Sequence, residues 1–254
     1  MIKGLYAAAS AMLAGLTRQK LISHNLANVD TPGFRQIMTS LDDFKDTSVN
    51  TIPGVTFGSD SQRYLGQLGL GTDTIPEVTD FSQAALRQTG YPLDAAIQGN
   101  AFFHIRTPNG DRYTRDGRFQ RDVAGNLVTP EGFSVLDNNG NPIKIPEGTV
   151  TIDQRGLISV NNRQAAQLGL AAFTNVKTEL ARDPESGDAF IAAGGPTATV
   201  AGTVEQGFIE NSNVNAAQMM TQMVTVNRAY EAAQRMVQTQ DELLGKAIDS
   251  IGKL

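Results

Sequence analysis

A long heptad repeat at the C-terminal end of the chain limits the folds that the chain can adopt. Apolar or small side chains recur there at alternating steps of three and four residues, the a and d positions of a coiled-coil helix. The series consists of Met219, Met223, Val226, Tyr230, Ala233, Val237, Gln240, Leu244, Ala247 and Ile251. Asn215, with Gln218 three residues later, forms a variant of the capping box that predicts where the helix begins. A single helix cannot bury such a stripe alone, so the repeat predicts a packing partner.

A second, shorter series lies at the N-terminal end. It consists of Ile2, Leu5, Ala9, Met12, Leu16, Gln19, Ser23 and Leu26. This segment carries basic residues such as Lys3 and Lys20 but no acidic residue, whereas the whole chain has 21 Lys and Arg against 26 Asp and Glu. Its apolar run imitates a secretory signal peptide but is too short to span a membrane. Cleavage would remove the stripe, so we interpret the run as a helix, and a cleaved signal is the alternative.

The two helical segments are separated by sequence of another kind. We therefore expect the helices to pack on each other, on copies of themselves, or both. Several a and d places hold polar or small residues, namely Ala9, Gln19, Ser23, Gln240 and Ala247. Such residues weaken a two-stranded coiled coil and favour closer packing with several partners. We favour self-assembly over a closed intramolecular hairpin, and two ordinary core-facing helices are the simpler alternative.

The middle of the chain has the pattern of short antiparallel strands. Runs rich in β-branched or aromatic residues, such as 101–106 and 111–115, alternate with turn signals such as Asn139-Gly140. We predict an α+β fold, with a discontinuous helical base of paired N- and C-terminal heptad helices and a central antiparallel β-rich domain. The predicted boundaries are 1–34 and 212–254 for the helical inner (assembly) domain, 35–88 for an extended arm and linker, and 89–211 for the β-rich outer domain.

A polar stretch from Ser23 to Phe34 (SHNLANVDTPGF) stands where the first helix must end. Asn25 and Asn28 carry short amide side chains that can satisfy terminal backbone groups. Thr31-Pro32-Gly33 predicts a turn with Pro at its second position and Gly at its third, and Phe34 offers an apolar anchor after it. A simple helix stop explains the Pro and the Gly, but it does not explain the order of residues 25–28.

This stretch resembles a motif of the bacterial flagellar axial proteins, the family of rod, hook and hook-associated proteins. Residues 25–34 match the family pattern NNLANxxTxGF/Y, with His24 in place of a usual Asn. Four further segments resemble family patterns in the expected order: 90–103 (GYPLDAAIQGNAFF), 113–119 (YTRDGRF), 207–214 (GFIENSNV) and 227–232 (NRAYEA). Ala101 replaces a usual Gly in the first of these. The resemblance spans nearly the whole chain, and the chain's length favours a rod protein of the proximal or distal type over a hook subunit.

The resemblance implies a structural subunit of the flagellar basal-body rod. Such a subunit self-assembles through its terminal helices into the helical axial drive shaft of cell motility. Its implied partners are copies of itself, other rod or hook axial proteins, and the flagellar type III export apparatus. The implied location is the periplasm-spanning rod of the basal body, reached by export without a cleaved signal peptide.

The resemblance and the periodicity together indicate the residues that carry assembly. For helix packing we predict Ile2, Leu5, Met12, Leu16, Leu26, Met219, Met223, Val226, Tyr230, Val237 and Leu244. For the helix-exit motif we predict Asn25, Asn28, Pro32, Gly33 and Phe34. Two other functions stay open. One is a secreted β-domain binding module on a helical oligomeric stalk, which would form an oligomer of fixed size; the other is a hook or hook-associated subunit.

The residue inventory predicts no enzyme, and no catalytic, cofactor or metal site. The chain has no cysteine, and its two histidines, His24 and His104, have no evident catalytic partner. Residues 137–141 resemble the start of a calcium loop, but Gly148 stands where such a loop requires Glu, so we predict a hairpin turn. The formal net charge of −5 argues against nucleic-acid binding, and we expect no direct membrane insertion.

Overall fold

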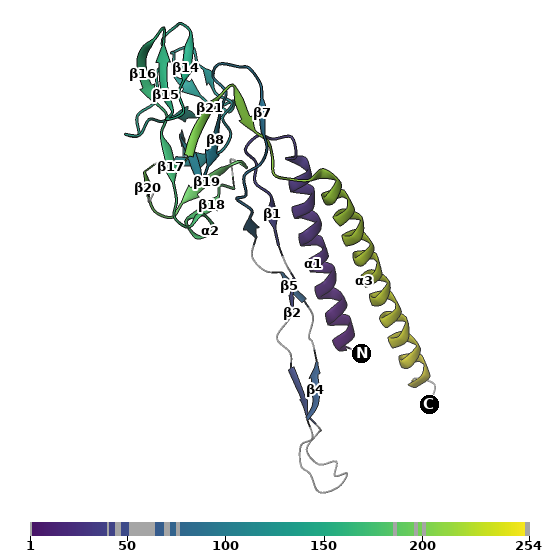
Figure 1. Cartoon of the computed structure of the whole chain (residues 1–254). Helices are drawn as coiled ribbons and strands as arrows, with labels where there is room; N and C mark the ends of the chain where they lie inside the picture. The colour runs from purple at the N-terminus through teal and green to yellow at the C-terminus, as the bar shows by residue number, and fades with distance from the viewer. Residues whose placement is uncertain are drawn as a thin grey trace. The chain divides into compact units, whose positions relative to one another are not determined.

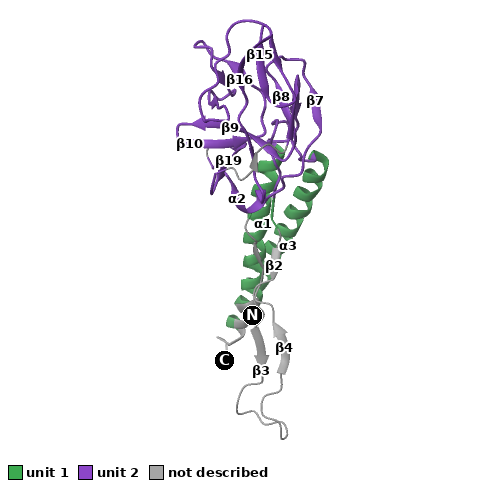
Figure 2. Cartoon of the chain, turned by 60° about the vertical axis from the view of Figure 1, so that its left-hand side comes forward, with its two compact units in different colours: residues 1–26, 38–77, 216–254 green, residues 27–37, 78–215 purple. Residues whose placement is uncertain are grey.

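The computed structural model describes residues 2–39, 41–43, 47–50, 64–68, 72–74, 77–184, 187–195, 198–199 and 202–251. The chain divides into two compact units, coloured differently in Figure 2. The helical unit comprises residues 1–26, 38–77 and 216–254, and the β-rich unit comprises residues 27–37 and 78–215. Helices at the two ends and antiparallel sheets between them give an α+β fold, as predicted.

The helical unit contains the two long helices. α1 spans Ile2–Ala27 and α3 spans Ala216–Ile251, and the two run side by side in Figure 1. A Cβ atom placed on Gly4 would lie 3.4 Å from the side-chain nitrogen of Gln240, and one on Gly15 would lie 3.7 Å from the ring of Tyr230. The later residue of α1, Gly15, contacts the earlier residue of α3, Tyr230, so the helices are antiparallel. In the described part of the chain, neither helix is long and apolar enough to cross a membrane.

The arm of the helical unit forms short antiparallel ladders. β2 (Leu41–Asp43) pairs with β5 (Thr72–Thr74), and β3 (Thr47–Asn50) pairs with β4 (Tyr64–Leu68). The sequence predicts only an extended arm here, because pairing between strands this far apart leaves no local signal.

The largest sheet of the β-rich unit is built around β9 (Ala101–Thr107). This strand pairs antiparallel with β10 (Gly110–Thr114), β13 (Ser134–Val135) and β17 (Leu170–Ala172). The sheet has nine strands in the order β11-β12-β13-β9-β10-β19-β18, with β17 pairing to both β9 and β20. Its other strands are β11 (Gln120–Arg121), β12 (Leu127–Val128), β18 (Leu180–Arg182), β19 (Ala189–Ala192) and β20 (Ala198–Thr199).

Smaller sheets complete the unit. A three-stranded meander joins β14 (Val150–Ile152), β15 (Leu157–Val160) and β16 (Arg163–Gln167). Asn161 and Asn162, between β15 and β16, both have positive φ, as a two-residue hairpin turn of type I′ requires. The remaining pairs are β8 (Ala95–Gly99) with β21 (Gly202–Gln206), β7 (Leu86–Gln88) with β22 (Phe208–Glu210), and β1 (Ile37–Met38) with β6 (Val78–Thr79). A short helix, α2 (Val176–Glu179), precedes β18.

Strand β9 separates two apolar clusters of the β-rich unit. Successive side chains of a strand point to opposite faces, so Phe103 and Ile105 enter one cluster while Phe102 enters the other. The ring centroid of Phe103 lies 4.9 Å from that of Phe119, edge to face. The centroid of Phe102 lies 6.0 Å from that of Phe190 in a similar arrangement. These aromatic contacts help to stabilise the two clusters.

Candidate functional site: the terminal helices and the helix exit

The predicted a and d residues of α3 lie on its less exposed side. Met219 and Val226 are buried. The predicted residues Met223, Tyr230, Val237 and Leu244 are partly buried. Large apolar residues outside the series are about half exposed, namely Met220, Val224, Met236 and Leu243. The repeat therefore follows the covered side of α3, and its role in contacts between subunits stays a prediction.

On α1 the covered side and the predicted stripe coincide only in part. Met12 and Leu26 are partly buried, but Leu5 and Leu16 are 37% and 47% exposed. The side chain of Ile2 lies outside the described part of the structure. Two glycines of α1, Gly4 and Gly15, lie on the side that faces α3. The sequence pattern did not separate these from the larger residues beside them.

Large apolar side chains remain exposed on another side of α1. Leu5, Ala9, Leu13 and Leu16 follow each other at steps of three and four residues, so they share one face. Leu13 is 68% exposed, and the neighbouring Tyr6 is 59% exposed. We call Leu5, Ala9, Leu13 and Leu16 the outer α1 face. A row of exposed apolar side chains is typical of an interaction surface.

The helix-exit turn has the geometry that its sequence predicts. The Phe34 amide donates a 3.3 Å hydrogen bond to the Thr31 carbonyl, and Gly33 has φ of +71°, as the third position of a type II turn requires. The Asn28 side-chain oxygen accepts a 3.2 Å hydrogen bond from the Thr31 hydroxyl. A Cβ atom on Gly33 would also collide with the backbone of Arg115. This position therefore requires glycine for two independent reasons.

The predicted exit residues divide between the two units. Asn25 is buried near the end of α1 in the helical unit. Asn28, Pro32, Gly33 and Phe34 belong to the β-rich unit, and Phe34 is fully buried there. The guanidinium of Arg182 lies 4.7 Å from the centre of the Phe34 ring, a cation–π contact within this unit. The end of the motif is therefore part of the β-rich core.

Three segments that are far apart in the sequence meet at the helix exit. They are 31–37, 80–85 and 207–213. The Gly33 amide donates to the Glu210 carbonyl over 2.8 Å, and the Gln36 amide donates to the Asn213 side-chain oxygen over 2.7 Å. The Asp80 amide donates to the Gln36 carbonyl over 2.9 Å. We call this arrangement the helix-exit clasp.

A buried cluster of charges lies inside the clasp. The carboxylate of Glu210 is 2.8 Å from the Arg35 guanidinium and 3.4 Å from that of Arg115. Side-chain exposure is 0% for Glu210 and Arg35 and 2% for Arg115. Sequence reasoning missed all three residues as a site. A signal existed, because Arg115 and Glu210 lie inside segments that match family patterns and Arg35 directly follows the first motif.

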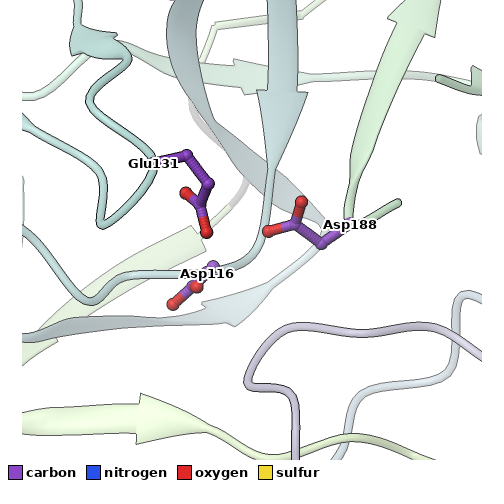
Figure 3. Close-up of side chains that lie close together, drawn as sticks. All are labelled: Asp116, Glu131 and Asp188. Atoms are coloured by element: carbon purple, nitrogen blue, oxygen red, sulfur yellow. The ribbon is translucent and has the colours of Figure 1, made fainter. Parts of the chain in front are cut away.

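A second charged cluster, which the sequence did not indicate, consists of Asp116, Glu131 and Asp188. Their carboxylate oxygens lie within 4.8 Å of one another, and Figure 3 shows the three side chains close together. Burial and the neighbouring charges of Asp116 and Glu131 raise the pKa of Asp188 to about 7. The Arg118 guanidinium approaches Asp116 to 2.6 Å and neutralises one of the three carboxylates. The cluster is a concentration of like charges with a single nearby counterion among the described residues.

The other polar residues that the sequence singled out have local structural contacts. The His104 ring stacks on Tyr113 at 5.1 Å, and its Nε2 lies 3.2 Å from the Asp111 carboxylate. The segment 137–141 is the predicted hairpin turn. The Gly140 amide donates to the Asp137 carbonyl over 3.1 Å, and the carboxylate of the same aspartate accepts two further backbone amides of the turn.

Three family profiles match the chain in succession. Residues 5–35 match the profile described as flagella basal body rod protein. Residues 96–160 match the flagellar hook protein FlgE/F/G D1 domain. Residues 205–250 match the flagellar basal body rod FlgEFG protein C-terminal region. The first match contains most of α1 and the last contains most of α3, so each covers part of the helical unit.

Curated relatives match over almost their whole length. The flagellar basal-body rod protein FlgG of Bacillus subtilis (strain 168) is 32% identical, covering 98% of this chain and 99% of the relative. FlgG of Borreliella burgdorferi is 33% identical over 97% of this chain and 98% of the relative. The flagellar basal-body rod protein FlgF of Rhizobium meliloti (strain 1021) is 35% identical over 99% of both.

Proposed function

This chain belongs to the flagellar basal-body rod protein family, and we propose that, as a structural subunit of the rod, it assembles through its terminal helices. Its neighbours in this proposal are copies of the chain and other rod or hook proteins. Head-to-tail contacts that do not close into a ring produce an open helical filament, which is what a drive shaft requires.

The observation that carries the proposal is the outer α1 face. α1 already has one side occupied by α3, yet it presents Leu5, Leu13 and Leu16 on another. Fully burying an exposed leucine contributes roughly 1.5–3 kcal/mol, and these leucines, 37–68% exposed, would each add part of that amount on association. Charge supports a partner helix of the α3 type. α1 has no acidic residue, whereas α3 carries four acidic residues against three basic ones.

The proposal is tested by placing a charge in the outer α1 face. In a strain that lacks the gene, we expect Leu13→Glu combined with Leu16→Glu to abolish incorporation into purified basal bodies and to leave cells without flagella. The purified variant should keep the wild-type melting temperature of the β-rich unit. Val123→Glu is the matched control, because Val123 is fully exposed in the β-rich unit. Normal flagellation by the double variant would refute the proposal.

Sedimentation of the wild-type chain over a range of concentrations separates the remaining alternative. Helical assembly predicts a species whose mass grows with concentration, or a monomer below a threshold. A dimer or trimer of constant mass would instead support the secreted stalk module.

We further propose that the chain leaves the cell through the flagellar export apparatus with its N-terminal segment intact. The support is that residues 5–16 carry the outer α1 face, which cleavage after the apolar run would remove. Intact-mass measurement of the protein from purified basal bodies should give the mass of the uncleaved chain. A mass lower than this by the mass of a signal peptide would refute this part of the proposal.

A further inference from the structure

The buried charges of the helix-exit clasp come from three distant parts of the chain. Arg35 follows the turn after α1, Arg115 follows β10, and Glu210 ends β22. All three belong to the β-rich unit. Their meeting therefore depends on the folded unit, and the way they meet fixes the position of the segments that lead out of it.

Glu210 is the centre of this arrangement. Its Oε1 accepts 2.8 Å hydrogen bonds from the Arg35 guanidinium and from the Ala84 amide, and its Oε2 accepts one from Arg115. Its backbone carbonyl accepts the Gly33 amide. One residue thus connects the helix exit, the segment before β7 and the turn after β10. Replacing its carboxylate removes the ion pairs with Arg35 and Arg115 at once, and it changes the acceptor of the Ala84 amide.

Each of the two guanidiniums also donates a hydrogen bond to a backbone carbonyl. Arg35 donates to the Ser82 carbonyl over 2.7 Å, and Arg115 donates to the Gly99 carbonyl over 2.6 Å. The Arg115 guanidinium also lies 4.6 Å from the centre of the Phe102 ring. Burial, together with the charge of Arg35, lowers the pKa of Arg115 to about 10. Two buried cations therefore share one carboxylate, an arrangement that tolerates little displacement of any member.

Such a cluster is a poor source of net stability, because removing three charges from water costs about as much as their attraction returns. The cluster strongly favours one conformation, because a carboxylate that moves away leaves two buried cations without their counterion. We propose that Arg35, Glu210 and Arg115 form a charge lock that holds the helix exit in one geometry in the free subunit, before assembly. Both segments that continue into the terminal helices then leave the β-rich unit from a preformed clasp.

Hydrogen exchange of the full-length chain, followed by mass spectrometry, tests the lock. For Glu210→Gln, which keeps the shape and removes the charge, we expect exchange at least about tenfold faster in peptides covering 31–37 and 80–85. Peptides of the β14–β16 sheet should be unchanged. Asp111→Asn is the matched control, because it removes the carboxylate of an exposed ion pair with Arg106. Unchanged exchange over 31–37 in Glu210→Gln would overturn the lock.

A second variant covers the case in which Glu210→Gln does not fold. Arg35→Met, Arg115→Met and Glu210→Leu together replace the cluster by apolar side chains, and we expect a folded protein whose melting temperature is at least that of the wild type. Exchange over 31–37 should still be faster, because apolar contacts do not select one geometry. Slow, wild-type exchange in this variant would overturn the lock.

The lock and the proposed assembly can fail independently. Both exchange experiments use the isolated chain, so they do not depend on whether the terminal helices pack between subunits. Loss of assembly in the outer α1 face variant, with normal exchange over 31–37, separates the two roles.

Discussion

The β-rich unit and the terminal helices differ in how completely they bury their largest apolar side chains. In the β-rich unit, Phe102, Phe103 and Phe190 are at most 1% exposed. On the helices, Leu13 and Ile248 are 68% and 69% exposed. The first pattern is that of a finished core, and the second is that of an element that lacks part of its packing.

The difference follows from what each sequence can bury locally. Strands of the β-rich unit pair with several neighbours, so both faces of β9 are covered within the unit. α1 meets α3 at Gly4 and Gly15, which have no side chain to bury there. Most helical stability in proteins comes from packing of an apolar face rather than from intrinsic propensity. We therefore expect the stability of the helical unit, but not that of the β-rich unit, to depend on assembly.

The sharpest test removes a large side chain from each region. Phe103→Ala should destabilise the isolated chain by about 3–5 kcal/mol, because it opens a cavity in the buried aromatic contact with Phe119. Leu13→Ala should change the free energy of unfolding by less than about 0.5 kcal/mol. Urea unfolding, monitored by far-UV circular dichroism and by the near-UV signal of Tyr and Phe, gives both values. Equal effects would contradict the distinction between the two regions.

The second test uses pH and concerns the β-rich unit alone. The pKa of Asp188 is about 7 in the folded chain, above its ordinary value of 3.8, so the folded state holds a proton that the unfolded state releases. The contribution of this bound proton to the free energy of unfolding is therefore complete below about pH 4, and it disappears as the pH rises through 7. The full shift corresponds to about 4 kcal/mol, which solvent at this partly buried carboxyl reduces to about 2 kcal/mol.

Asp188→Asn should remove this dependence. We expect the variant to be more stable than the wild type at pH 8 and about equally stable at pH 4, as measured by thermal unfolding at both values. Glu179→Gln, a carboxylate outside the cluster, is the control. A variant that is less stable than the wild type at pH 8 would show that the charged form of Asp188 is favoured in the folded state.

The third test concerns the contact between the two helices. Tyr230→Ala removes the ring that lies against Gly15, and we expect a loss of about 1 kcal/mol in the isolated chain. The readout is hydrogen exchange of α1 and α3, which should quicken while the strands of the β-rich unit keep their protection. Faster exchange in both units would mean that they unfold together.

The smallest expected effect lies on the surface of the β-rich unit. Arg106 and Asp111 form an ion pair at 2.8 Å with side chains 46% and 41% exposed. The neighbouring guanidinium lowers the pKa of Asp111, but solvent screens such a pair. We expect Arg106→Gln to leave the melting temperature nearly unchanged, with any difference shrinking in high salt. A loss as large as that of Phe103→Ala would contradict the view that the aromatic core carries the unit's stability.

Local signals predicted a large part of this fold. The capping pattern at Asn215 places the start of α3 correctly, and Thr31-Pro32-Gly33 forms the expected turn. The hairpin around β9 and β10 also follows its turn residues. Each of these features depends on residues close together in the sequence, where spacing and backbone preference act directly.

The charge lock and the acidic cluster had no local signal of this kind, although Arg115 and Glu210 lie inside segments that match family patterns. Arg35 and Glu210 are 175 positions apart, and nothing in their neighbourhoods shows that they meet. Their pairing depends on how β22 and the helix exit are placed within one folded unit. The same limit applies to α1, where periodicity cannot tell which apolar side faces α3 and which remains exposed.

By itself the amino-acid sequence determined the helical ends, the antiparallel strands between them and the turn at the end of α1, because periodicity and turn chemistry are local. Only the tertiary structure decided which face of α1 stays uncovered and which three charges share the buried clasp. Those features are contacts between distant segments, and their energies depend on burial, which exists only once the chain is folded.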